Sequence, residues 1–177
     1  MSYAEWFPGP EPHVAKGSAA ISLEATVMVE VGFAIPDVTV KDDGGKDVRL
    51  TEIPRPFVLY FYPKADTPGC TSEGGQFRDL YEQFTGKGTE IIGVSRDTVD
   101  AQHAFKVKYS FPFRLLADVD SKICDAFGTI VERERDGVKS KGVARATFLV
   151  GKSGKVEKVW PAVSVEGHGA DVLACVL

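Results

Sequence analysis

Hydrophobic positions in this chain fall into short runs that glycine and polar turns separate. Residues 57–62 and 90–95 are two nearly continuous apolar runs rich in aromatic and β-branched side chains, which is typical of strands buried on both faces. Between these runs the apolar positions recur at i, i+3, i+4 and i+7. That spacing predicts an amphipathic helix through Phe77, Leu80, Tyr81 and Phe84.

The rest of the pattern predicts a mixed sheet covered by helices. A glycine-containing turn at 42–46 lies between two short β-branched segments and predicts an N-terminal β-hairpin. Further strands are expected at 113–117, 144–150 and 155–160, and further helices at 101–109, 121–127 and 165–177. This order predicts an α/β fold with a central mixed sheet and helices on both faces.

Residues 1–30 differ from the rest of the chain. Prolines at positions 8, 10 and 12 exclude a regular helix or a central strand there. We expect an extended arm that docks through its aromatic residues, or a tail, followed by one domain over residues 31–177.

Composition narrows the function. The chain has 177 residues, 44% hydrophobic and 26% charged, as in a globular domain. Its net charge of −4 argues against nucleic acid as a partner. No apolar stretch approaches the roughly 20 residues of a membrane helix, and the N-terminus lacks a secretory pattern. We therefore expect a cytoplasmic protein. Its three cysteines and three histidines have no metal-ligand spacing, so neither a metal nor a cofactor is expected.

Cys70 is the candidate reactive group. It follows the loop between the strand ending at Tyr62 and the predicted helix, and a helix N-terminus favours a thiolate. Pro63 stiffens this loop, and the Thr67 hydroxyl can cap the helix or donate to a group near the sulfur. Position alone fits equally well with a buried cysteine that packs against the sheet.

The residues around Cys70 resemble a known family. Pro63-x-x-x-Thr67-x-x-Cys70 matches the peroxiredoxin signature, and residues 62–73 are similar to the bacterioferritin-comigratory protein or peroxiredoxin Q subfamily. The likeness extends over roughly residues 31–175, where residues 31–37 resemble the subfamily's first strand and residues 144–150 the strand that carries its active-site arginine. It implies a thioredoxin-like fold and a thiol-dependent peroxidase that acts on hydrogen peroxide and organic hydroperoxides.

The resemblance also implies roles for single residues. Cys70 would attack a peroxide oxygen as thiolate and become a sulfenic acid, while Arg145 stabilises the charge that develops. Thr67 would hydrogen-bond the peroxide or the sulfur, and Pro63 would shield the thiolate from water. Arg145 could instead pair with a surface carboxylate. Glu73 could orient an arginine or be a solvated acid of the first helical turn.

The chain departs from the subfamily at the position of its usual resolving cysteine, which is Gly75 here. We therefore expect a one-cysteine enzyme, monomeric or homodimeric, that thioredoxin, glutaredoxin or glutathione reduces. Resolution by Cys175 near the C-terminus, or by Cys124, remains an alternative.

Other functions compete with peroxide reduction. A redox sensor or chaperone on the same fold would turn over peroxide slowly. A thioredoxin-type oxidoreductase would need a second cysteine where Thr67 stands. Acyl transfer would need a histidine base, and no motif links His103 or His168 to Cys70.

Overall fold

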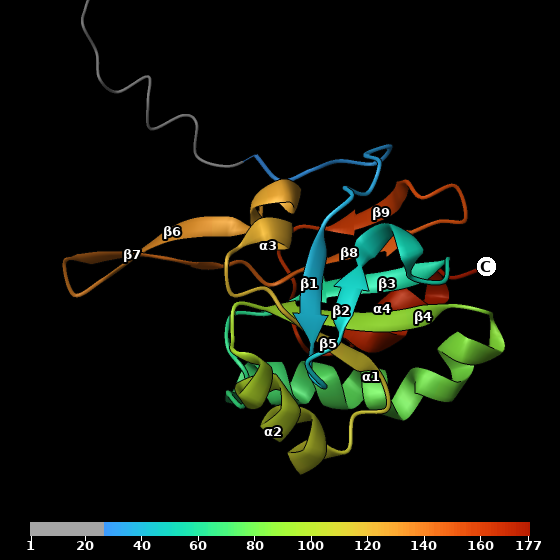
Figure 1. Cartoon of the computed structure of the whole chain (residues 1–177), viewed down its shortest axis with the longest axis horizontal. Coiled ribbons are helices and arrows are strands. Elements are labelled where there is room, and N and C mark those ends of the chain that lie inside the picture. The colour runs from blue at the N-terminus through green and yellow to red at the C-terminus, as the bar shows by residue number, and fades with distance from the viewer. Residues whose placement is uncertain (1–26) are drawn as a thin grey trace, which may run out of the picture.

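The computed structural model describes residues 27–177, so the predicted arm or tail lies, apart from its last four residues, outside the described part (Figure 1). Those last residues lie against the domain. The Val29 amide donates to the Phe127 carbonyl at 3.0 Å, and Met28 and Val29 pack on the hydrophobic core.

A seven-stranded sheet forms the centre of the domain, in the order β2-β1-β5-β4-β3-β8-β9. β3 pairs parallel with β4, and β4 parallel with β5, whereas the other pairs are antiparallel. The prediction of a mixed sheet with an N-terminal hairpin is confirmed. The strands are β1 Thr39–Asp42, β2 Asp47–Arg49, β3 Phe57–Phe61, β4 Glu90–Ser95, β5 Arg114–Ala117, β8 Ala146–Val150 and β9 Val156–Trp160, with a 3-10 helix at Leu50–Glu52.

Helices cover both faces of the sheet. The side chains of β3 alternate between these faces and so contribute to two hydrophobic clusters, one on each side. Phe57, Leu59 and Phe61 belong to one cluster, together with the helix α3 (Lys122–Phe127). Val58 and Tyr60 belong to the other, which packs against the remaining helices. These are α1 (Pro68–Gly86), α2 (Val99–Tyr109) and α4 (His168–Ala174).

Three features differ from the sequence predictions. Residues 31–37 form no strand and contribute only the isolated bridge Ala34↔Lys155. The C-terminal helix is shorter than expected, since a glycine with a φ of 72° precedes its first residue. The hairpin of β6 (Ile130–Arg135) and β7 (Val138–Val143) was not predicted, and it projects from the domain (Figure 1). Its turn, Asp136-Gly137, has positive φ at both residues and was the available signal.

Among the helices of residues 27–177, none combines the length and apolar composition that a bilayer crossing requires.

Candidate active site

Cys70 is the third residue of α1, directly beyond the carboxyl end of β3. It is 1% exposed and packs in the cluster of Tyr60 and Phe77. Thr67 holds the N-cap position, but its side chain makes no capping hydrogen bond and donates to the Lys64 carbonyl at 2.8 Å. Of the two alternatives for this hydroxyl, helix capping is therefore wrong, because the hydroxyl is bonded within the preceding loop.

The loop that begins at the half-buried Pro63 is tied to the neighbouring elements. The Ala65 amide donates to the Asp97 carboxylate at 2.8 Å, just beyond the end of β4. Asp66, at a φ of 59°, accepts hydrogen bonds from the Tyr109 hydroxyl at 2.6 Å and the Lys108 ammonium at 2.9 Å, both at the end of α2. These contacts hold the start of α1, and with it the Cys70 sulfur, relative to the sheet.

Arg145 reaches Cys70 from the far end of the sequence. It precedes β8, whose first residue, Ala146, pairs with Phe61 of β3, so it lies at the same edge of the sheet as Cys70. The observed strand thus begins one residue after Arg145 rather than including it. Its Nη2 lies 3.4 Å from the Cys70 Sγ. Gly69 leaves room for this contact, since a Cβ there would lie 2.9 Å from Nη2.

Glu73 is the second partner of the Arg145 guanidinium. Its Oε1 accepts from Nη1 at 3.3 Å, and the side chain is fully buried, so the alternative of a solvated acid is wrong. The other oxygen, Oε2, has no hydrogen-bond partner within the described chain, nor does the buried hydroxyl of Tyr60. Burial raises the pKa of Glu73 to about 7, although the Arg145 charge opposes the shift.

His168 of α4 is a further buried polar group that the sequence did not single out. Its Nε2 lies 2.8 Å from the Thr147 Oγ1 in β8, two residues after Arg145. Burial lowers the pKa of His168 to about 4, and the Arg145 charge adds to this shift while Asp171 opposes it. A lone histidine with no motif gave no signal for this placement.

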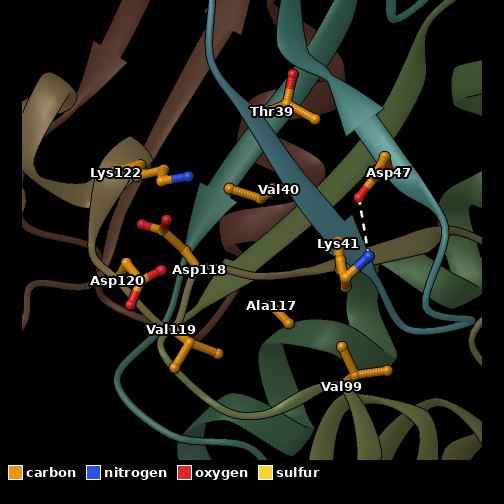
Figure 2. Close-up of a pocket in the computed structure, with 10 residues that line it drawn as sticks. All are labelled: Thr39, Val40, Lys41, Asp47, Val99, Ala117, Asp118, Val119, Asp120 and Lys122. Atoms are coloured by element: carbon orange, nitrogen blue, oxygen red, sulfur yellow. Dashed lines mark hydrogen bonds and ion pairs between the residues drawn. The ribbon is translucent and has the colours of Figure 1, made fainter.

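A hollow of about 250 Å3 beside β1 contains none of the four predicted site residues and is lined largely by charged and aliphatic side chains such as Lys41, Asp47 and Asp118 (Figure 2). No group of three or more metal-ligating side chains occurs within residues 27–177.

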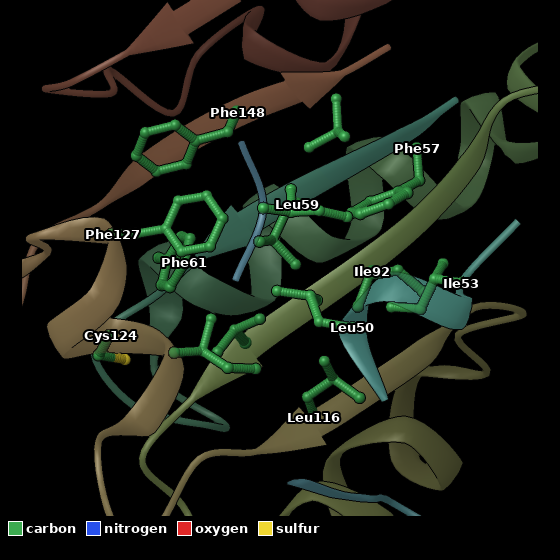
Figure 3. Close-up of a cluster of buried hydrophobic side chains, with 14 of the residues drawn as sticks. Leu50, Ile53, Phe57, Leu59, Phe61, Ile92, Leu116, Cys124, Phe127 and Phe148 are labelled. Carbon is green, nitrogen blue, oxygen red and sulfur yellow. The ribbon is translucent and has the colours of Figure 1, made fainter. Parts of the chain in front are cut away.

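The other two cysteines lie apart from Cys70. Cys124 packs beside Phe61 and Phe127 on the opposite face of the sheet (Figure 3), and burial raises the pKa of its thiol, as does nearby Asp118. Cys175 is on the same face as Cys70, but the next residue, Val176, accepts a hydrogen bond from Lys87 at the far end of α1. With about 1.5 Å per helical residue, that end lies roughly 26 Å from Cys70.

Comparisons with known proteins agree on one family. The sequence model of the AhpC/TSA family matches residues 31–159. Peroxiredoxin Bcp of Bacillus subtilis is 40% identical over 146 residues, which are 82% of this chain and 93% of that protein. Peroxiredoxin Bcp of Xanthomonas campestris is 39% identical over 148 residues, 83% and 92% of the two chains. A solved structure of the X. campestris bacterioferritin comigratory protein is 38% identical, with a TM-score of 0.77 over 85% of this chain and 96% of that one.

The chain therefore belongs to the AhpC/TSA family, and the protein is a peroxiredoxin, an enzyme that reduces peroxides at the expense of a thiol reductant. The two relatives and the solved structure named above belong to the Bcp or peroxiredoxin Q group. The predicted family and the thioredoxin-like fold are confirmed.

Proposed function

We propose that Cys70 is the nucleophile of this peroxiredoxin. The observation that carries the proposal is the Arg145 guanidinium 3.4 Å from a sulfur that is 1% exposed. In this nearly dry setting, a fixed positive charge stabilises negative charge on the sulfur much more than it would in water. The start of α1 adds the unpaired amide groups of its first turn.

The reaction follows from this placement. The Cys70 thiolate attacks one peroxide oxygen, an S–O bond forms and the O–O bond breaks. The sulfur becomes a sulfenic acid, and the other oxygen departs as water or an alcohol once it is protonated. Arg145 faces the negative charge that moves from the sulfur to the leaving oxygen. Thr67 offers its hydroxyl to the bound peroxide by turning away from the Lys64 carbonyl, and Pro63 keeps water from the thiolate.

We assign the second half of the cycle to an external thiol, that of thioredoxin, glutaredoxin or glutathione. Gly75 occupies the usual place of a resolving cysteine. Cys124 lies across the sheet from Cys70, and Cys175 lies near the far end of α1. An intramolecular disulfide with Cys175 would need α4 to leave its place along α1. We place the protein in a reducing compartment such as the cytoplasm, because three sparse cysteines do not make a disulfide framework.

Cys70 must become accessible before another protein can reduce it. Two successive glycines, Gly74 and Gly75, lie one turn after Cys70 in α1. Each costs about 0.5–1 kcal/mol relative to alanine within a helix. We propose that the first turns of α1 unwind at these residues and present the sulfenic acid. Hydrogen exchange at Gly74 and Gly75 as slow as in the rest of α1 would contradict this step.

A peroxidase assay tests the function. Hydrogen peroxide and tert-butyl hydroperoxide are each supplied with a thioredoxin or a glutathione system, and the wild type is compared with Cys70→Ser and Cys175→Ser. We expect turnover in the wild type and in Cys175→Ser, and none in Cys70→Ser. Wild-type protein that is inactive with every peroxide and every reductant would refute the assignment and favour the sensor or chaperone alternative. A Cys70–Cys175 disulfide, seen by mass spectrometry after peroxide treatment, would refute the one-cysteine cycle.

A further inference from the structure

One positive charge faces two acids at the active site. The Arg145 Nη2 lies 3.4 Å from the Cys70 sulfur, and its Nη1 donates to the Glu73 Oε1 at 3.3 Å. Cys70 and Glu73 are three residues apart on α1, so both project from the same face of the helix. The Glu73 side chain is fully buried and the Cys70 residue nearly so.

A buried site of this kind favours a single negative charge. With both acids ionised, one half-buried guanidinium would have to balance two buried negative charges, a thiolate and a carboxylate, which is costly. With both acids protonated, the half-buried guanidinium would have no counter-ion. When the two acids hold one proton between them, the single negative charge balances that of Arg145. This is so whether the proton is on Cys70, leaving a carboxylate, or on Glu73, leaving a thiolate.

Within residues 27–177, Arg145 is the one charged group that shifts the pKa of Glu73. From β3, Tyr60 presents a neutral hydroxyl, whose pKa burial raises well above its ordinary value. On the loop before β5, Phe111 contacts the adjacent Gly74 and is apolar. From α4, His168 pairs with Thr147, and its pKa is lowered to about 4. At neutral pH the exchange is thus confined to Cys70 and Glu73.

Resting on the function proposed above, we propose that Glu73 is the proton carrier of the peroxide reaction. The Cys70 thiol gives its proton to the Glu73 carboxylate, which yields a thiolate and a neutral carboxylic acid on either side of Arg145. The thiolate then attacks the peroxide, the O–O bond breaks, and the leaving oxygen takes the proton from Glu73. Water or an alcohol departs, and Glu73 is a carboxylate again beside a sulfenic acid.

The unpaired Oε2 is the atom that carries this proton, since Oε1 is engaged with Arg145. A carboxyl group whose pKa is raised to about 7 suits the task, because general acid–base catalysis is most effective when the pKa lies near the working pH. A carboxyl with an ordinary pKa would be ionised at neutral pH and would have no proton to give.

The substitution Glu73→Gln separates proton transfer from positioning. Glutamine keeps the size and can still accept from Arg145, but it neither takes nor gives the proton. Arg145 then faces Cys70 alone, so alkylation by iodoacetamide, whose leaving iodide needs no proton, should at pH 5–6 be at least as fast as in the wild type. Oxidation of Cys70 by tert-butyl hydroperoxide should fall on the order of 10- to 100-fold.

The leaving group provides the second readout. Peroxyacetic acid releases acetate, which needs no proton, so Glu73→Gln should keep its wild-type rate with this oxidant within about threefold. Glu82→Gln, at an exposed position of the same helix, is the matched control and should leave all three rates unchanged. Circular dichroism and a urea midpoint verify that each variant is folded.

Two results would overturn the proposal. Equal loss of all three reactions in folded Glu73→Gln would mean that Glu73 only positions Arg145. Unchanged reaction of folded Glu73→Gln with tert-butyl hydroperoxide would mean that no proton passes through this residue. If Glu73→Gln does not fold, unchanged rates in a folded Glu73→Met, which has a similar length and no carboxyl, would mean the same. If instead the proposed function is wrong, wild-type Cys70 will react with no peroxide. That result is distinguishable from a failure of the Glu73 proposal alone, in which the wild type stays active.

Discussion

Gly69→Ala tests whether the Arg145 contact controls the reactivity of Cys70. A Cβ at position 69 would lie 2.9 Å from Nη2, whereas an ordinary contact needs roughly 3.4 Å. The guanidinium end of a long side chain can retreat, so the fold should tolerate the change. Alanine also favours the helix over glycine by about 0.5–1 kcal/mol. We therefore expect a protein at least as stable as the wild type with a less reactive cysteine.

The magnitude follows from the geometry. Nη2 now lies 3.4 Å from the sulfur. At an effective dielectric constant of about 20, a retreat of ~0.5 Å weakens the attraction between the two charges by about 0.6 kcal/mol. If the hydrogen bond to the charged sulfur is lost as well, the loss grows to about 2 kcal/mol. The rate of Cys70 oxidation should therefore fall by a factor between about 3 and 30.

The assay is the second-order rate of Cys70 oxidation under single-turnover conditions, followed by stopped flow, with a urea midpoint measured on the same sample. Gly86→Ala is the matched control, since it lies in the same helix and its new Cβ would meet nothing within 4 Å. It should leave the rate unchanged. A folded Gly69→Ala protein that reacts as fast as the wild type would refute the idea that the Arg145 contact governs reactivity.

Three further predictions concern stability. Tyr60→Phe removes a buried hydroxyl without a partner in the described chain, so we expect the urea midpoint to rise by the equivalent of about 1 kcal/mol. Gly74→Ala should destabilise by about 1–3 kcal/mol, because the new Cβ would lie 2.6 Å from the Phe111 ring; an unchanged midpoint would contradict that packing. The pKa of His168 is lowered to about 4 in the folded state, so the unfolded chain binds its proton first as the pH falls. The contribution of His168 to stability should thus fall by up to roughly 3 kcal/mol between pH 6.5 and 4, while the raised pKa of Glu73 works in the opposite direction in the same range. The difference in stability between the wild type and His168→Gln, measured against pH, isolates the His168 contribution and should shrink by that amount as the pH falls.

The sequence pattern was sufficient for the elements whose signals are local. Residues 57–62 alternate between two buried faces, and the spacing of Phe77 and Phe84 matches the inner face of α1. The motif around Cys70 likewise lies within one strand-loop-helix segment. The β6–β7 hairpin was missed because its strands are exposed and charged, so no alternation of buried and exposed positions marks them.

The sequence by itself therefore determined the family, the order of the main elements and the candidate thiol, since each depends on residues that are close along the chain. The tertiary structure decided what surrounds that thiol. The antiparallel pairing of β3 with β8 brings Arg145 to Cys70 across 75 residues. Burial decides between the two alternatives left open for Glu73, which orients Arg145 rather than facing solvent. The tertiary structure also places Cys124 and Cys70 on opposite faces of the sheet. No local pattern encodes these contacts, because strand pairing and burial arise only when distant segments pack together.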